Sequence, residues 1–348
     1  MHELAQATKA RPADHLSGMS VFVLSVMAAL GAAPSGYDPH VAQRLIAYAD
    51  AAYCGDKAHG GTDTYTKWDC PPCSLVPDFS LDAVLASPLH QTFALAGVDG
   101  MLDAPVLSFR GSVLPLNYVD DMDTVRVAWW PTSSGGGTYA RGFLRSYSSL
   151  QAQAFAAVRR LVSQKPGRPV YVTGHSLGAA QSTLAALDLA ANFTATQFVL
   201  VNFGALRVGD AVAARFHAAM PNLRTWRVVH RADAAPQGVK RDGLSGFTHV
   251  PTEVWYPDGC RDDPLCSKPA GTAPFDFVVC DGSGEDPHCQ DSVAANVTNM
   301  KDHDLYLNHS MWCCAGDATV CNFPFSGGPT PAPHARALVT HRALNRRL

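Results

Sequence analysis

One short segment of this 348-residue chain has the pattern expected of a nucleophilic serine. Ser176 is at the centre of Gly174–Gly178, which reads Gly-His-Ser-Leu-Gly and matches the pattern G-x-S-x-G. The strand-like run Val170–Thr173 precedes it directly, and a stretch rich in Ala and Leu, typical of a helix, follows it. A strand-turn-helix segment presents the serine hydroxyl above a sheet, near a helix N-terminus that favours developing negative charge. Side chains on the two glycines would collide with neighbouring backbone in so tight a turn.

A serine needs a base that a carboxylate orients, and after this type of turn the order along the chain is serine, acid, histidine. Asp233 is the best candidate acid, because it follows the strand-like run Thr225–His230 by a few residues. Asp188 falls inside the helix after the serine, and Asp210 falls at the start of the next helix. We therefore expect both of these aspartates to be structural.

Several histidines follow the candidate acid, at positions 249, 288, 303, 309, 334 and 341. His249 comes directly before a strand-like run, which favours a structural hydrogen bond over catalysis. His303 and His309 remain as candidate bases, and their spacing alone does not separate them.

The composition excludes several other classes of function. With 27 Lys and Arg against 30 Asp and Glu, the net charge of −3 leaves no positive surplus for a nucleic-acid partner. No P-loop and no G-x-G-x-x-G is present, so no nucleotide cofactor is expected. Cys70-Pro-Pro-Cys73 has no second C-x-x-C to complete a zinc site, and a disulfide is the simpler interpretation. We expect neither a cofactor nor a metal ion.

Strand-like and helix-like runs alternate along the middle of the chain. The expected helices cover 39–53, 144–161, the stretch after Ser176 and 211–219, and the expected strands cover 91–98, 105–109, 170–173, 198–203, 225–229 and 252–255. This alternation predicts an α/β fold with a mainly parallel sheet covered by helices on both faces. Residues 37–325 contain no linker and are expected to form one domain. Residues 326–348, rich in Pro and Gly and then basic, are expected to be a disordered tail.

The first 36 residues have the layout of a signal peptide or leader. Lys9 and Arg11 precede the apolar run Met19–Ala33, whose length of about 15 residues is short of the roughly 20 needed to cross a bilayer. Met19 is an alternative start, and a buried helix is the alternative structure. Ten cysteines, with most of them in the last third, fit an oxidising compartment, as do the acceptor sequons at Asn192, Asn296 and Asn308. We expect an extracellular protein.

The chain resembles the class 3 family of secreted, fungal-type triacylglycerol lipases, from about Tyr48 to Cys314. The resemblance rests on a series of motifs in order: Ala52-Tyr53-Cys54, Trp68–Cys73, Phe109-Arg110-Gly111-Ser112, the Ser176 turn, Phe203-Gly204, Arg207–Asp210, Asp233 with Pro236, Glu253–Tyr256, and Asp302-His303 with Tyr306. It implies an α/β-hydrolase fold with Ser176 as nucleophile, Asp233 as acid and His303 as base. It also implies an oxyanion hole formed by Ser112 and the backbone N–H of Leu177.

The same resemblance implies three disulfides: Cys70–Cys73, Cys280–Cys289 and Cys54–Cys314. Cys313 is the alternative to Cys314 in the last of these. The even number of cysteines suggests two further bridges, for which Cys260–Cys266 and Cys313–Cys321 are the closest pairs in sequence.

The expected function is hydrolysis of lipid esters, most simply of triacylglycerols at an oil–water interface, without an obligate protein partner. Apolar and acidic residues alternate over Val113–Asp123, which predicts a short amphipathic lid that contacts the lipid surface only peripherally. Two alternatives are a feruloyl-type esterase acting on plant cell-wall esters and a lipase-like binding module without catalysis.

Overall fold

The core of the fold is a mainly parallel sheet of eight strands in the order β1-β2-β3-β6-β7-β9-β11-β12. The computed structural model describes residues 36–55, 65, 67–113, 123–129, 136–239, 246–257 and 277–313. The strands are β1 (Phe79–Ser87), β2 (Thr92–Asp99), β3 (Ala104–Phe109), β6 (Val170–Gly174), β7 (Phe198–Phe203), β9 (Leu223–His230), β11 (Glu253–Tyr256) and β12 (Val278–Val279). Pairing is parallel from β3 through β11, and antiparallel between β1 and β2, β2 and β3, and β11 and β12.

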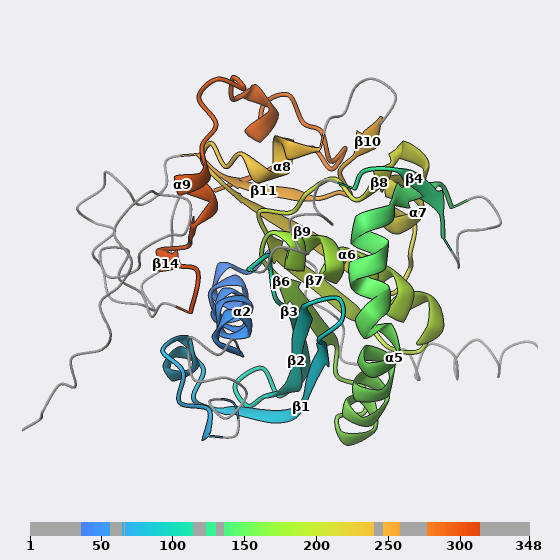
Figure 1. Cartoon of the computed structure of the whole chain (residues 1–348), viewed down its shortest axis with the longest axis vertical. Helices are drawn as coiled ribbons and strands as arrows, with labels where there is room; N and C mark the ends of the chain where they lie inside the picture. Colours follow the sequence, from blue (N-terminus) through green and yellow to red (C-terminus); the bar gives the residue numbers. More distant parts are fainter. Residues whose placement is uncertain are drawn as a thin grey trace, which may run out of the picture.

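Helices cover both faces of this sheet, as the alternating pattern predicts (Figure 1). Helix α2 (Pro39–Ala51) packs on one face, and α5 (Arg141–Gln164) and α6 (Leu177–Asn192) pack on the other. Every residue of β6 and β7 is buried, because apolar side chains on both sides of these central strands meet a helical layer. Asp38 accepts a hydrogen bond from the His40 backbone N–H and so caps α2 ahead of Pro39.

Short elements surround the main sheet. A second sheet has the order β10 (Phe247–Thr248), β8 (Gly209–Asp210), β5 (Thr138–Ala140) and β4 (Arg126–Ala128), and β13 (Leu305–Tyr306) pairs with β14 (His309–Ser310). The remaining helices are α7 (Ala211–Ala218), α8 (Ala235–Gly238) and α9 (Met300–His303), with 3-10 turns η1 (Ala52–Gly55), η3 (Pro72–Leu75) and η7 (Gln290–Ser292). Asp210 caps α7, which confirms the structural role expected of it.

The disulfides confirm two of the expected pairs and correct the third. Cys70 bonds Cys73, and Cys280 bonds Cys289. Cys54 bonds Cys313, so the expectation of Cys54–Cys314 is wrong, and a Cys313–Cys321 bridge is excluded with it. The backbone N–H of Cys313 donates to the buried Asp50 carboxylate of α2, which holds this cysteine rather than the next one beside Cys54.

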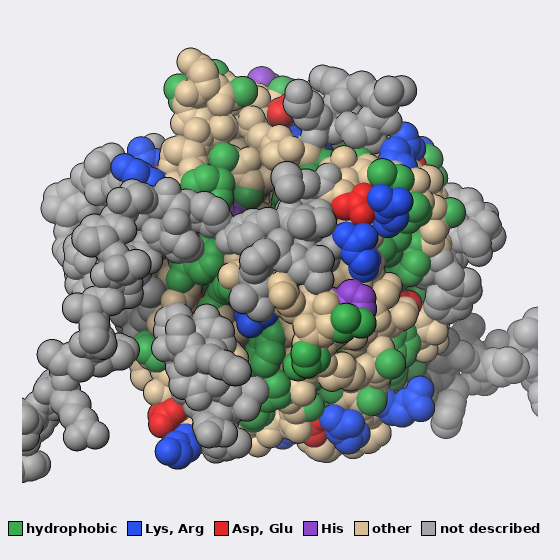
Figure 2. All heavy atoms as spheres, viewed as in Figure 1, with side chains coloured by type: hydrophobic (Ala, Val, Ile, Leu, Met, Phe, Trp, Pro, Cys, Tyr) green, Lys and Arg blue, Asp and Glu red, His purple; other side chains and the backbone are tan. Residues whose placement is uncertain are grey.

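Several expectations concern parts of the chain outside the described residues: the leader, the C-terminal tail, most of the lid segment, and Cys260, Cys266, Cys314 and Cys321. In the described part, no helix is long and apolar enough to cross a membrane. On the face shown in Figure 2, the described Lys and Arg side chains lie in small separate groups without a continuous basic patch.

Candidate active site

Ser176 lies in a strained turn between β6 and α6. Its backbone has φ 61° and ψ −127°, in the left-handed region that a residue with a side chain rarely adopts. Its N–H donates to the Phe203 carbonyl at the end of β7, at 3.1 Å. The turn therefore lies at the carboxyl ends of two central parallel strands, where α/β sheets place their active sites.

The two glycines of the turn have the close contacts that the sequence predicts. A Cβ on Gly174 would lie 2.3 Å from the carbonyl oxygen of Gly178, and a Cβ on Gly178 would lie 2.2 Å from that of Phe109. Real Cβ atoms do not approach backbone so closely. Gly174 and Gly178 therefore let α6 approach β3 closely, with the half-buried Ser176 at the turn between β6 and α6.

Asp233 and His303 come together although 70 residues separate them. Nδ1 of His303 lies 2.9 Å from Oδ2 of Asp233, and both side chains are buried. Asp233 follows β9, and His303 is the last residue of α9. An isolated bridge between Asp233 and Asn299 joins the two segments, since Ala234 N–H donates to Asn299 O and Asn299 N–H donates to Ala232 O.

The carboxylate of Asp233 has two further donors that fix its orientation. The backbone N–H of Ala235 donates to Oδ1 at 2.7 Å, and the hydroxyl of Tyr306 donates to Oδ2. Burial, with the nearby charge of Asp233, raises the pKa of Tyr306 well above its ordinary value, so Tyr306 stays protonated as a donor. Because a carboxylate only accepts hydrogen bonds, Nδ1 of His303 carries the proton that it donates to Asp233, and Nε2 of the neutral ring has the lone pair.

His175, next to the serine, is fixed in a different role. Its Nε2 lies 2.7 Å from the carbonyl oxygen of His303 and must carry the proton, so its Nδ1 accepts from the Tyr53 hydroxyl at 2.8 Å. Burial, and then the neighbouring His303, lowers the pKa of His175 well below its ordinary range. The two imidazole rings pack with centroids 4.4 Å apart. His175 therefore stays neutral and brings His303 next to the Ser176 turn.

The segment before Ser112 lies against the same turn. A Cβ on Gly111 would lie 2.7 Å from the carbonyl oxygen of His175, and Ser112 itself is buried. Leu177 is the first residue of α6, where backbone N–H groups have no acceptor within the helix. Of the two residues expected to form the oxyanion hole, Leu177 thus directly follows Ser176, and Ser112 directly follows the glycine that lies against His175.

The other candidates lie away from this pair. His309, the rival base, places Nε2 2.9 Å from Oδ2 of the buried Asp50, so it joins the C-terminal segment to α2. His249 donates to the Pro236 carbonyl, the structural role expected of it. Asp188 accepts from Tyr147 and Gln151 within the helical layer.

One group of possible metal ligands occurs among the described residues, namely Glu253, Cys280 and Cys289. The two sulfur atoms are joined in a disulfide, and the Glu253 carboxylate accepts hydrogen bonds from Arg227 and Gln290. This group therefore has no thiolate to offer a metal ion.

Gly204 is a further position beside the Asp233–His303 pair, and the residue patterns assign no role to it. Its φ is +59°, and a Cβ there would lie 2.8 Å from Nδ1 of His303 and 2.9 Å from Oδ2 of Asp233. Gly204 thus leaves the space in which these two side chains meet. Its sequence signals are its place in the Phe203-Gly204 motif of the family resemblance and its position directly after a buried strand, where glycine marks a close approach.

Gly204→Ala is expected to lower kcat by about 100-fold or more. The added methyl group would push Asp233 and His303 apart or away from the serine turn, and a misplacement of about 1 Å is enough for such a loss. Steady-state hydrolysis of a soluble ester measures this. Gly167→Ala is the matched control, since Gly167 also has a positive φ (75°) but is exposed at the far end of β6. It should cost about 1 kcal/mol of stability and leave kcat unchanged. Equal activity of the two variants would contradict the role given to Gly204.

Comparisons with known proteins identify a family and several relatives of this chain. Residues 106–242 match the family model described as lipase (class 3). The lipase of Rhizomucor miehei is 28% identical over 268 residues, covering 76% of this chain and 67% of that protein. The secreted mono- and diacylglycerol lipase A of Penicillium cyclopium is 31% identical over 219 residues, covering 60% of this chain and 68% of that protein.

A solved structure of a triacylglycerol lipase, whose catalytic centre is described as a serine protease triad, is also similar. It has a TM-score of 0.65 and 25% identity, with coverage of 81% of this chain and 99% of that chain. The match thus extends from the sequence to the arrangement of the sheet and its helices. With its α/β-hydrolase fold and G-x-S-x-G turn, this chain belongs to the class 3 lipase family, whose members are serine enzymes that hydrolyse lipid esters.

Proposed function

We propose that this chain hydrolyses acylglycerols through an acyl-enzyme, with Ser176 as nucleophile, His303 as base and Asp233 as the orienting acid. The observation that carries the proposal is the buried Asp233–His303 pair beside the strained serine turn. Nδ1 of His303 faces Asp233, so Nε2 is the ring nitrogen on the opposite side of the imidazole. That nitrogen is the atom that a serine hydroxyl needs as proton acceptor.

In the first half-reaction, Ser176 Oγ attacks the ester carbonyl carbon while Nε2 of His303 takes the hydroxyl proton. The imidazolium that forms lies against the Asp233 carboxylate, which stabilises it without taking the proton. The tetrahedral intermediate then loses the alcohol, to which His303 returns the proton. In the second half-reaction, water repeats the attack with the same base, and the fatty acid leaves Ser176.

The negative oxygen of each intermediate needs donors that are in place before the reaction. We assign this role to Ser112 and the backbone N–H of Leu177, as the family resemblance implies. The N-terminal end of α6 adds a favourable dipole at this position. Such preorganised donors usually contribute about 3 to 4 kcal/mol of transition-state stabilisation each.

Acylglycerols are the proposed substrate class because the named relatives are lipases, including a mono- and diacylglycerol lipase and a triacylglycerol lipase. Extracellular location is proposed on related grounds. The Penicillium cyclopium relative is named as secreted, and the described disulfides fit an oxidising compartment. The proposed lid over Val113–Asp123 would turn its apolar side toward a lipid droplet.

One assay separates the substrate classes. We expect release of fatty acid from emulsified triacylglycerol, with a steep rise in rate once a short-chain triacylglycerol passes its solubility limit and droplets form. Methyl ferulate serves as the competing substrate. Preferred hydrolysis of methyl ferulate with smooth saturation below the solubility limit would favour a feruloyl-type esterase, and no hydrolysis of any ester would favour a binding module.

A further inference from the structure

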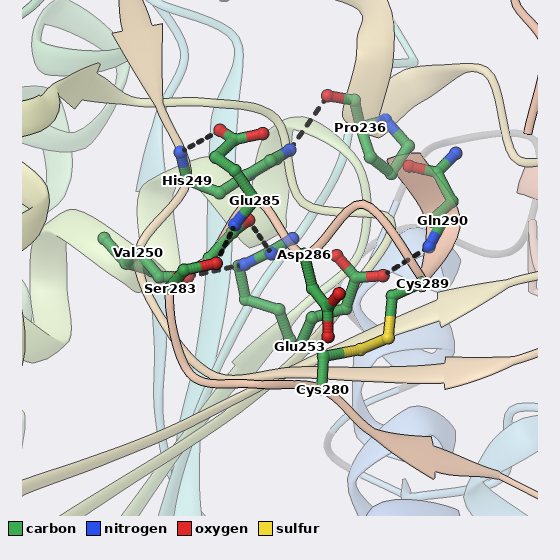
Figure 3. Close-up of polar contacts among 12 residues, drawn as sticks. Pro236, His249, Val250, Glu253, Cys280, Ser283, Glu285, Asp286, Cys289 and Gln290 are labelled. Carbon is green, nitrogen blue, oxygen red and sulfur yellow. Dashed lines mark hydrogen bonds and ion pairs between the residues drawn. A yellow bond between two sulfur atoms is a disulfide. The ribbon is translucent and has the colours of Figure 1, made fainter. Parts of the chain in front are cut away.

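The loop that carries Asp233 and Pro236 contacts a largely buried cluster of polar and charged side chains, most of which Figure 3 shows around Pro236 and Glu253. We call this group the support cluster. It consists of Arg207, Arg227, His249, Glu253, Glu285 and Gln290. None of these side chains belongs to the proposed triad, and charged groups are buried in a protein only where they have partners.

A series of three contacts connects the sheet with Asp233. Arg227, in β9 and 1% exposed, donates from Nη2 to Oε2 of Glu253 at 3.1 Å. Oε1 of Glu253 accepts from the backbone N–H of Gln290 at 3.0 Å. Nε2 of Gln290 then donates to the backbone carbonyl of Asp233 at 2.7 Å. The backbone of Gln290 is therefore held by Glu253, and its side chain in turn holds the backbone carbonyl of Asp233.

The Cys280–Cys289 disulfide closes this arrangement. Cys289 directly precedes Gln290, and the backbone N–H of Cys280 donates to the Glu253 carbonyl at 3.0 Å. Figure 3 shows the bridge beside Glu253, with the dashed contact from Glu253 to Gln290 next to it. One cysteine of the bridge is thus hydrogen-bonded to Glu253, and the other is next to Gln290, which is also hydrogen-bonded to Glu253. The bridge therefore limits how far Gln290 can move from β11.

A second part of the support cluster holds the same loop at Pro236. Arg207 Nη1 and His249 Nε2 both donate to the Pro236 carbonyl, at 3.0 and 2.9 Å. Arg207 is held by two contacts to Glu285, of 2.8 and 2.7 Å. Although burial opposes it, Arg207 holds the pKa of Glu285 below its ordinary value, so the pair is ionised. The Asp233 loop is thereby fixed at two points, and Gln290 contacts the acid itself.

We propose that Gln290 is a positioning residue for Asp233, clamped by Glu253 and the Cys280–Cys289 bridge. This inference rests on the proposed role of Asp233 in catalysis. The hydrogen bond from Gln290 sets the position of the Asp233 backbone, and with it the direction in which Oδ2 meets His303. Shifts of an ångström or less at such a contact lower turnover, because the imidazolium is then less well stabilised in the transition state.

Gln290→Met tests this, because methionine keeps the length of the side chain and the backbone N–H but lacks the donor. We expect kcat for a soluble short-chain ester to fall by about 10- to 100-fold, with KM within about two-fold. Asn222→Leu is the matched control. Asn222 is equally buried, and its amide donates to the carbonyls of Ala190, Phe193 and Thr196 away from the site. It should lower the melting temperature and leave kcat unchanged.

A double-mutant cycle with Asp233→Asn distinguishes positioning from a general structural role. If Gln290 acts through Asp233, Gln290→Met lowers kcat by less than about two-fold in the Asp233→Asn background. Equal fold-changes in both backgrounds, or a wild-type kcat for Gln290→Met, would overturn the inference. Should Gln290→Met fail to fold, Gln290→Asn gives the same test, since its amide is one methylene too short to reach Asp233. Wild-type activity of Asp233→Asn itself would instead overturn the proposed function.

The Cys70–Cys73 disulfide serves as a control for the role of the Cys280–Cys289 disulfide. Replacing Cys280 and Cys289 together by serine is expected to lower kcat in the same way as Gln290→Met, with KM unchanged. Replacing Cys70 and Cys73 together removes another short-range bridge, which lies away from the Asp233 loop, and should leave kcat unchanged. Equal losses of kcat in the two double variants would contradict the clamp.

Discussion

Ser176→Ala is expected to lower kcat for ester hydrolysis by about 10⁴- to 10⁶-fold while the protein stays folded. Without Oγ no acyl-enzyme forms, and only the oxyanion donors and substrate binding remain. The rate of fatty-acid or chromophore release measures the loss, and circular dichroism with a thermal scan checks the fold. Activity within ten-fold of wild type would contradict Ser176 as the nucleophile.

A second substitution at the same position separates chemistry from backbone strain. Ser176 has a positive φ, which costs a residue with a side chain of the order of 1 to 3 kcal/mol. Ser176→Gly removes both the hydroxyl and this cost, so it should be as inactive as Ser176→Ala and have a higher melting temperature. A stabilised but inactive glycine variant would show that the strain in the turn is maintained for the reaction.

The serine turn could be predicted from sequence because its determinants are local. A strand, two glycines with a serine between them, and an Ala-rich helix lie within about 20 consecutive residues. Each residue has one role in that geometry, and the close contacts at Gly174 and Gly178 agree with it. The central strands could be predicted for a similar reason, since β6 and β7 are buried on both faces and are therefore mainly apolar.

The polar support of the acid could not be predicted, because its residue types usually lie at the surface. Arg227 lies in the predicted strand, yet it is 1% exposed and its partners are Glu253 and two backbone carbonyls. Only the fold brings these groups together, from β9, β11 and the loop closed by Cys280 and Cys289. Strand β1 was missed for a related reason, since most of its residues are only partly buried and its pattern does not alternate.

The partner of Cys54 could not be predicted from sequence for a similar reason, since it lies 259 residues away. Cys313 and Cys314 are adjacent, so their spacing from Cys54 does not separate them. The choice depends on Asp50, whose carboxylate accepts the backbone N–H of Cys313 and the ring N–H of His309. This carboxylate lies on α2, more than 250 residues before its two partners.

The contact between His309 and Asp50 also explains why the two candidate bases could not be distinguished from sequence. His303 and His309 are six residues apart, and each is buried with its ring against an aspartate. His303 meets Asp233 beside the serine turn, whereas His309 meets Asp50 on the helix that covers the sheet. Sequence order favours an acid that follows the serine, and only His303 has one as its partner.

His303→Ala is therefore expected to lower kcat by about 10⁴-fold or more with little change in KM, since both proton transfers are lost. His309→Ala should instead leave the buried Asp50 without this partner and lower stability by about 3 to 5 kcal/mol. Its kcat, measured well below its melting temperature, should stay within ten-fold of wild type. The reverse result, an active His303→Ala and a folded but inactive His309→Ala, would identify His309 as the base.

The pH profile gives an independent check, because a histidine base must be neutral and kcat/KM should fall as the solution becomes acidic. Asp304, next to His303, also changes its charge at mildly acidic pH, since burial raises its pKa to about 6. For a carboxyl group with a raised pKa, the folded state binds the extra proton, so stability decreases as pH rises from about 4 to 6. Asp304→Asn removes this change of stability. An acid limb of kcat/KM that persists in Asp304→Asn therefore reports His303, and an acid limb that disappears would assign it to Asp304.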